Sequence, residues 1–354
     1  MLVLRPLAFH DLAGLERLAV ISGGRMTTLP DNRDHLSQLI SNTQQSLRKE
    51  VERPAGESYH FVLEDTETGE VVGVSGIEAA VGISSPFYSY RIDDVVHASS
   101  ELQIHNRVPA LHLCQDYTGA SRLYTLFMDD QLLGKAYRQP ENIHLLSRAR
   151  MLFIAAHPER FSPRLIVELQ GVADEKNQSP FWECLGRHFF NMDFNKANYL
   201  TGINSKGFIA DLMPHYPVYV PMLNPDAQAV LGKARADMRD VQKLLEEEGF
   251  EYRRYVDIFD AGPTLEARTE YVRSVSQSRC MPVVVGVRDS DVGDVGVGNG
   301  DIASSHSLAL ISNNQLNNYR CIMAPINPEQ PMLSEAQAEA LQLASGDSAR
   351  LLWL

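Results

Sequence analysis

Short apolar strands alternate with helical segments along the chain, and this order constrains the fold more than any other feature. Residues 2–4 form an apolar extended run, and residues 12–19 carry leucine and alanine at helical spacing. Two β-branched runs, 59–64 and 71–78, flank the polar turn sequence 65–70. The first part of the chain therefore predicts a strand, a helix and a β-hairpin in that order.

A second strand and helix unit follows. Residues 102–113 contain two short strand candidates, and residues 123–128 predict a strand ahead of a helix at 145–156. The apolar run 165–169 predicts the next strand, after which Ser179-Pro180 is a typical helix start. This order favours an α+β fold in which a mixed β-sheet is flanked by helices.

The remaining chain predicts further α/β structure. We expect a helix from about residue 225 to 249, a strand at 252–259 and a short helix at 335–345. The length of 354 residues exceeds that of one average domain. We therefore expect one domain at residues 1–210 and a C-terminal α/β extension at residues 211–354 packed on it.

Composition narrows the possible functions. The chain is 44% hydrophobic and 22% charged, which is typical of a globular protein, and it lacks an apolar run of the roughly 20 residues that span a bilayer. A net charge of −13 repels nucleic-acid phosphates and anionic lipid surfaces. The four cysteines form no C-x-x-C pair. We expect a cytoplasmic protein with no metal site, no nucleic-acid partner and no membrane partner.

The loop after the predicted strand 123–128 carries a motif. Its sequence Gln131-Leu132-Leu133-Gly134-Lys135-Ala136 fits the [Q/R]-x-x-G-x-[G/A] pattern of the GNAT acyl-CoA transferases, and the helix 145–156 follows it. A strand edge can bind the amides of the coenzyme A arm, and a helix N-terminus can bind its pyrophosphate. The pattern therefore indicates an acyl-CoA site.

Longer segments spread over nearly the whole chain are similar to arginine N-succinyltransferases, a branch of the GNAT superfamily. These segments are residues 24–30 (GRMTTLP), 96–99 (VHAS), 116–119 (DYTG), 145–156 (LLSRARMLFIAA), 179–183 (SPFWE), 208–214 (FIADLMP) and 255–264 (YVDIFDAGPT). The resemblance implies transfer of succinyl from succinyl-CoA to the α-amine of arginine, or of ornithine, in arginine catabolism. It makes residues 1–210 a GNAT-like acyl-CoA-binding domain whose sheet is splayed, and it places Leu126, Phe127, Met128 and Gly134 at the coenzyme.

The resemblance also bears on the proton donor. The family has a histidine where this chain has Arg235, and the tyrosine that other GNAT enzymes use is replaced by Trp182. Arginine stays protonated at neutral pH, and an indole is not an acid, so neither side chain can protonate the departing thiolate. Histidine titrates near neutrality, which makes His97 and His215 the candidates to replace the missing acid.

Charged side chains suited to the two substrates lie at predicted strands and loops. Carboxylates match the guanidinium of arginine, and arginine side chains match the succinyl carboxylate, in both cases through paired hydrogen bonds. The candidates for the amine substrate are Glu78, Glu168, Asp257 and Asp260, and those for the succinyl group are Arg25 and Arg91.

Two other functions stay open at this point. The chain could be a catalytically weakened structural or regulatory subunit that pairs with a histidine-bearing homologue, because the family includes paired α and β subunits. It could also be an N-acyltransferase for another amine, because one fold hosts many substrates. In each case we expect a homo-oligomer or a hetero-oligomer with a homologous subunit.

Overall fold

A computed structural model describes residues 1–24, 26–129, 141–202, 207–214, 216–286 and 307–354. Fourteen of the described strands form one sheet in the order β11-β16-β13-β14-β1-β2-β3-β6-β7-β10-β9-β4-β5-β8. The strands are β1 Leu2–Pro6, β2 Ser58–Asp65, β3 Glu70–Glu78, β4 Ser89–Ser99, β5 Ile104–Cys114, β6 Ser121–Met128, β7 Arg164–Glu168, β8 Val218–Tyr219, β9 Glu251–Val256, β10 Pro263–Arg268, β11 Arg279–Pro282, β13 Ser307–Asn313, β14 Cys321–Ile326 and β16 Ser348–Trp353, with β12 Val284–Val285 and β15 Met332–Leu333 forming a separate pair.

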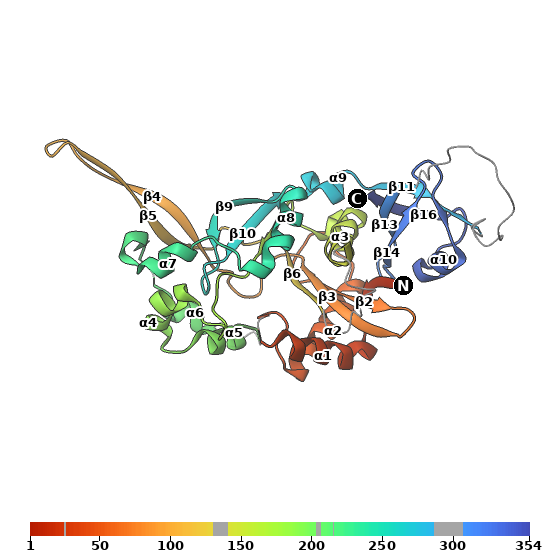
Figure 1. Ribbon diagram of the computed structural model, residues 1–354, viewed down its shortest axis with the longest axis horizontal. Helices are drawn as coiled ribbons and strands as arrows, with labels where there is room; N and C mark the ends of the chain where they lie inside the picture. The colour runs from red at the N-terminus through yellow and green to blue at the C-terminus, as the bar shows by residue number, and fades with distance from the viewer. Residues whose placement is uncertain (25, 130–140, 203–206, 215, 287–306) are drawn as a thin grey trace, which may run out of the picture.

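The described helices flank this sheet (Figure 1). They are α1 Leu12–Ser22, α2 Arg33–Arg48, α3 Glu141–Ala156, α4 Arg187–Phe190, α5 Phe194–Gly202, α6 Gly207–Leu212, α7 Pro225–Val230, α8 Arg239–Glu247, α9 Arg273–Ser276 and α10 Glu335–Leu341. The observed architecture is thus a mixed sheet flanked by helices, as the element order predicts.

Opposite faces of β2 carry different parts of the core. Phe61 packs in one cluster with Phe153 of α3, whereas its neighbour Val62 packs in another cluster with Leu15 of α1 and Leu36 of α2. Successive side chains of a strand point to opposite faces, so this alternation places α3 on one face and the α1–α2 pair on the other. The central strands are therefore covered on both sides.

The sheet also joins the two ends of the chain. Leu4 of β1 pairs with Cys321 of β14, which makes the C-terminal strands an extension of the N-terminal ones. The boundary at residue 210 stays a prediction, and strands from both sides of it belong to the same sheet. Among the described residues no helix has the length and apolar character needed to cross a membrane.

The pairing of β6 with β7 is short and parallel. Only three residue pairs join the two strands, Ser121 with Leu165, Arg122 with Ile166 and Leu123 with Val167, although β6 continues to Met128. On its other side β6 pairs with β3, and a register shift there sets two residues, Thr125 and Leu126, against the single residue Ser75. Thr125 has a positive φ of 49°. A bulge of this kind bends a strand, so β6 parts from β7 after Leu123.

Strands β4 and β5 form an arm that extends away from the rest of the protein (Figure 1). The two strands pair over eleven residues, from Ser89–Cys114 to Ser99–Ile104. The backbone of the rest of the sheet pairs only with the lower part of this ladder, since β9 pairs with residues 90–91 and β8 with residues 110–111. The far half of the arm is therefore a two-stranded ribbon.

Two predicted elements differ from the structure. The helix expected from 225 to 249 is wrong, because α7 ends at Val230 and α8 begins only at Arg239. Gly232 has a positive φ of 65° and faces the ring of Tyr252, so the chain turns there instead of continuing as a helix. The two short candidates within 102–113 form the single strand β5, and its partner β4 was not predicted.

Candidate active site

An arginine between two glutamates lies where β6 and β7 begin to part. Arg122 of β6 donates from Nη2 to Glu78 of β3 (2.7 Å) and from Nη1 to Glu168 of β7 (2.9 Å). Burial opposes the charge of Arg122, but the two carboxylates outweigh it and raise its pKa. Glu78 and Glu168, which the sequence nominates separately, are thus brought to one point by the strand order.

A tyrosine and a histidine continue this polar group. Tyr124 Oη lies 2.9 Å from Nε2 of His60, and Nδ1 of His60 lies 3.1 Å from Oγ1 of Thr43 on α2. Burial, assisted by the charge of His35, lowers the pKa of His60 to about 3, so this imidazole is neutral at pH 7. The guanidinium of Arg122 stacks on the ring of Tyr124 at 5.1 Å. None of these contacts was predicted.

The strand that the sequence assigns to the coenzyme is β6, and beyond Leu123 no described strand pairs with its edge on the β7 side. The N–H of Asp129 donates to Val72 O on the β3 side (2.9 Å), and amides alternate in direction along a strand. The N–H groups of Leu126 and Met128 therefore point to the edge that β7 has left. Leu126 and Met128 pack against the α3 side of the core and Phe127 against the α1–α2 side.

A cavity of about 720 Å³ lies between the segment after α1 and the residues around α5 and Arg235. Its lining includes four acidic residues and two basic ones, namely Asp31, Asp174, Glu175, Asp237, Lys176 and Arg235. Asp174 is partly committed to its own turn, where Oδ1 accepts from the N–H groups of Lys176 (2.9 Å) and Gln178 (2.8 Å). Asp31 and Glu175 supply negative charge to the cavity, whereas Asp237 is paired with Arg235. No periodic pattern in the sequence marks these acids.

Arg235 joins this cavity to the end of β7. Its N–H donates to Gln170 O (2.8 Å), and Ala234 forms an isolated bridge with Gly171. Its side chain donates from Nε and Nη2 to both carboxylate oxygens of Asp237, at 2.6 and 2.8 Å. Gln170 lies two residues after Glu168, so residues 168–170 connect the Arg122 group to the backbone of Arg235 at the edge of the cavity.

Comparison with known proteins identifies the family. A sequence profile described as arginine N-succinyltransferase beta subunit matches residues 2–274. The chain belongs to the arginine N-succinyltransferase family. It is 42% identical to the arginine N-succinyltransferase of Yersinia pseudotuberculosis over 100% of this chain and 98% of that protein. It is 41% identical to the arginine N-succinyltransferase subunit alpha of Pseudomonas aeruginosa, with 99% of each chain covered.

A solved structure agrees with this assignment. The arginine/ornithine succinyltransferase subunit AI of Pseudomonas aeruginosa superposes with a TM-score of 0.86 at 40% identity, covering 100% of this chain and 98% of that one. The mixed sheet with its flanking helices is therefore the fold of an arginine N-succinyltransferase family member.

Asp257 and Asp260, two further acids nominated from the sequence, stabilise a turn. Asp257 Oδ1 accepts from the N–H groups of Phe259 (2.6 Å) and Asp260 (3.0 Å), and Asp260 accepts from those of Gly262 and Gly171, both at 2.8 Å. Burial, followed by the charge of Asp260, raises the pKa of Asp257 to about 7. A substrate contact for Asp257 stays a prediction.

The remaining nominated residues of this succinyltransferase family member are spread over the molecule. His97 lies on the arm, with its ring 5.6 Å from that of Tyr219. Trp182 is buried and donates from Nε1 to Met192 O (3.0 Å). Arg25, Gly134 and His215 lie outside the described residues, so their assigned roles stay predictions.

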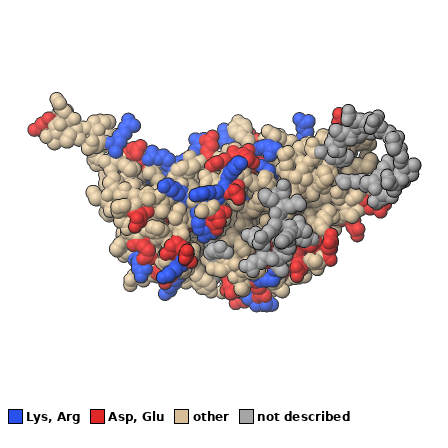
Figure 2. Space-filling model, in the orientation of Figure 1, with Lys and Arg blue, Asp and Glu red and all other residues tan. Residues whose placement is uncertain are grey.

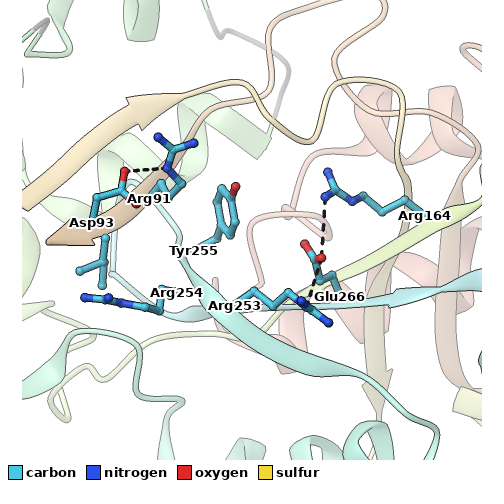
Figure 3. A pocket seen from close by; sticks show the side chains of 8 residues that line it. Arg91, Asp93, Arg164, Arg253, Arg254, Tyr255 and Glu266 are labelled. Carbon is cyan, nitrogen blue, oxygen red and sulfur yellow. Dashed lines mark hydrogen bonds and ion pairs between the residues drawn. The ribbon is translucent and has the colours of Figure 1, made fainter.

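Arg91 lies in a groove at some distance from Glu168. The ladder leads from Arg91 through Tyr255 and Thr264 to Glu168, three strand spacings or about 14 Å. The groove measures about 510 Å³ and is lined by Arg91, Ile92, Asp93, Arg164, Arg253, Arg254, Tyr255 and Glu266 (Figure 3). All four of its arginines have acidic partners within 4 Å. Basic and acidic side chains are likewise mixed on the face of the molecule that Figure 2 shows. A succinyl contact for Arg91 stays a prediction.

Proposed function

We propose that this chain transfers succinyl from succinyl-CoA to the α-amine of arginine or ornithine, with β6 as its coenzyme-binding strand. The observation that carries the proposal is the parting of β6 from β7 beside the Arg122 group and the acidic cavity. In the reaction the amine nitrogen bonds to the thioester carbon and gives up one proton, the carbon–sulfur bond breaks, and the departing thiolate takes up one proton. The enzyme is accordingly an acyltransferase.

Succinyl-CoA is the proposed cosubstrate, bound in a GNAT-like slot. The N–H groups of Leu126 and Met128 point to the free edge of β6 and can bond the amides of the pantetheine arm as an added strand would. Helix α3 follows β6 in the chain, and a helix N-terminus favours phosphate. Gly134 and its loop keep their predicted role near the pyrophosphate.

The acidic cavity is the proposed acceptor pocket. A guanidinium forms its strongest contacts with carboxylates, and Asp31 and Glu175 supply them beside the Arg235–Asp237 pair. Glu78 and Glu168 lie nearer the coenzyme strand, where we place the α-amine of the acceptor. Arginine would then span from the Arg122 group to the cavity.

The proton donor is the second question. Arg235 is paired with Asp237 and cannot release a proton at neutral pH. This observation favours a second candidate function, in which the chain is a weakened subunit completed by a homologue that carries the histidine. The rate of the purified chain, alone and mixed with such a homologue, separates the two functions.

The arm formed by β4 and β5 is the proposed contact with a homologous subunit. The similarity to a protein named subunit alpha supports an assembly, and an isolated two-stranded hairpin is at best marginally stable in water. Its far half exposes Val96 (52%), Leu102 (68%) and Ile104 (44%). Residues 95–108 contain one acidic residue, Glu101, and one arginine, Arg107. This part of the arm therefore has almost no net charge and would not repel an acidic homologous subunit. The cytoplasmic location stays a prediction.

The direct test is a coupled assay of free thiol released from succinyl-CoA with arginine, ornithine and lysine as acceptors. Turnover with arginine or ornithine and succinyl-CoA, but not with acetyl-CoA, would support the proposed function. Turnover with another amine alone would support the broader N-acyltransferase alternative. No turnover in any mixture, including one with a histidine-bearing homologue, would contradict both.

A further inference from the structure

Arg150 of helix α3 is a buried arginine directed at the point where β6 departs from β7. Its Nη1 donates to two backbone carbonyl oxygens, Gly76 O of β3 (3.2 Å) and Tyr124 O of β6 (3.1 Å). The other donors bond within α3, from Nε to Ser147 O and from Nη2 to Ser147 Oγ, both at 3.2 Å. The Arg150 side chain thus bonds to the backbone of both strands beside the bulge in the β3–β6 ladder.

The charge of Arg150 has no carboxylate partner among the residues that the structure describes. Arg148, two residues earlier on the same helix, pairs with Glu248 at 2.6 Å, and Arg160 lies 3.7 Å from Glu159. Burial alone lowers the pKa of Arg150 to about 9, which leaves it protonated at pH 7. Burying an unpaired charge is costly, and a neutral amide could bond the same two carbonyl groups at lower cost.

The contacted carbonyl belongs to the peptide group that joins Tyr124 to Thr125. This peptide is trans, so the Thr125 N–H points away from the carbonyl and away from Arg150. Thr125 belongs to the bulge, in which Thr125 and Leu126 together oppose the single residue Ser75 of β3. Its buried hydroxyl has no hydrogen-bond partner within the described part of the chain. Thr125 therefore offers two hydrogen-bond donors, its backbone N–H and its hydroxyl, near the point where β6 separates from β7.

Arg150 can strengthen the first of these donors. A hydrogen bond to a peptide carbonyl polarises the whole peptide group and makes its N–H a better donor. The positive charge also favours any negative charge that develops beyond that N–H, because the surroundings are of low dielectric. Both effects act through the Tyr124–Thr125 peptide, without contact between Arg150 and a substrate.

We propose that Arg150 is a positioning residue that, through the Tyr124–Thr125 peptide, stabilises the negative charge formed on the thioester oxygen during acyl transfer. The inference rests on the proposed function, because it needs the acyl group of succinyl-CoA at the start of the slot. As the amine nitrogen bonds to the carbonyl carbon, an electron pair moves to the oxygen. When this pair returns, the carbon–sulfur bond breaks and the thiolate takes up a proton.

The test separates charge from hydrogen bonding with Arg150→Gln and Arg150→Lys. The glutamine variant can keep the carbonyl contacts without a charge, and the lysine variant keeps the charge with fewer contacts. Losing one direct oxyanion donor costs about 100-fold to 1000-fold in kcat, so we expect a loss of about tenfold for the indirect effect in Arg150→Gln. The KM for succinyl-CoA should stay within about twofold, and Arg150→Lys should keep more of kcat than the glutamine variant.

The matched control is Arg160→Gln. Arg160 is also buried and donates to carbonyl oxygens, Ser46 O (3.1 Å) and Lys49 O (2.8 Å), but these lie on α2 and just after it. Its substitution should lower the melting temperature without changing kcat.

Two outcomes would overturn the role of Arg150 while the proposed function stands. One is a wild-type rate in Arg150→Gln, and the other is an equal loss of kcat in all three variants. If Arg150→Gln does not fold, the lysine variant decides. A buried lysine has a lowered pKa, so its kcat should fall with rising pH where the wild type does not, and a parallel profile would overturn the inference. An inactive wild type would refute the proposed function itself and this inference with it.

Discussion

Replacing Arg235 by histidine should convert the chain into a faster enzyme. The position is suited to an acid, because the backbone N–H of Arg235 is fixed by Gln170 O and its side chain reaches Asp237, both within 2.8 Å. A histidine that reaches the same carboxylate would have a raised pKa and would be protonated near pH 7. A positioned general acid contributes about 100-fold to 10,000-fold, so Arg235→His should raise kcat by at least about 100-fold.

The expected gain in kcat can be expressed as a change in the activation free energy of acyl transfer. A 100-fold gain corresponds to about 2.7 kcal/mol of transition-state stabilisation. The assay is the release of coenzyme A thiol with arginine as acceptor, recorded from pH 6 to pH 9. The gain should be present at low pH and lost as the pH rises through the pKa of the new histidine, because only the protonated imidazole donates.

The control variant is Arg235→Gln, which removes the guanidinium and adds no acid. If Arg235→His and Arg235→Gln have equal rates and equal pH profiles, the missing acid does not limit this chain. The reasoning from Arg235 would then be refuted, and His97 and His215 would become the next variants to measure.

Three further expectations concern the acceptor site, the buried turn and the arm. Glu168→Gln should raise the KM for arginine about tenfold and leave the KM for succinyl-CoA unchanged, because a charged hydrogen bond is worth roughly 1.5–3 kcal/mol. The control is Glu183→Gln, since Glu183 forms an exposed i,i+4 pair with Arg187. If the two variants have equal KM values for arginine, the assignment of Glu168 to the acceptor site is wrong. The pKa of Asp257 is raised from its ordinary value of 3.8 to about 7 in the fold. The folded state therefore binds the proton more tightly than the unfolded state, so stability should fall as the pH rises from about 4 to 7. Asp257→Asn should reduce that fall in melting temperature, and an unchanged slope would refute the pKa shift. Changing Val96, Leu102 and Ile104 together to serine should lower the molar mass measured by light scattering, whereas a wild-type chain that is already monomeric would exclude the arm as a subunit contact.

Local patterns predicted the elements that rest on periodicity. The hairpin at 59–78 is confirmed because two apolar, β-branched runs flank a polar turn. The strand at 123–128 and the helix at 145–156 are confirmed within a few residues. The helix expected from 225 to 249 fails because its interruption depends on tertiary contacts. Ala234 bridges to Gly171, and the turn at Gly232 is bonded to Ala261 O. No propensity within the segment encodes these partners.

The site was less accessible to sequence reasoning because its members meet only through the strand order. Glu78 and Glu168 are ninety residues apart, and Arg122, which joins them, had no reason to be singled out until β3, β6 and β7 were known to be neighbours.

Arg150 presents the same difficulty more strongly. Arg148 and Arg150 stand two positions apart on one helix, yet one pairs with the carboxylate of Glu248 and the other with backbone carbonyl oxygens. Side chains two positions apart on a helix point about 200° apart, so the two arginines meet different neighbours. The carbonyl oxygens that Arg150 contacts lie beside the bulge at Thr125 and Leu126, a feature of the backbone with no residue type of its own. A charged residue that acts through a peptide group, as we propose for Arg150, can therefore be recognised only once the bulge in the neighbouring strand is known.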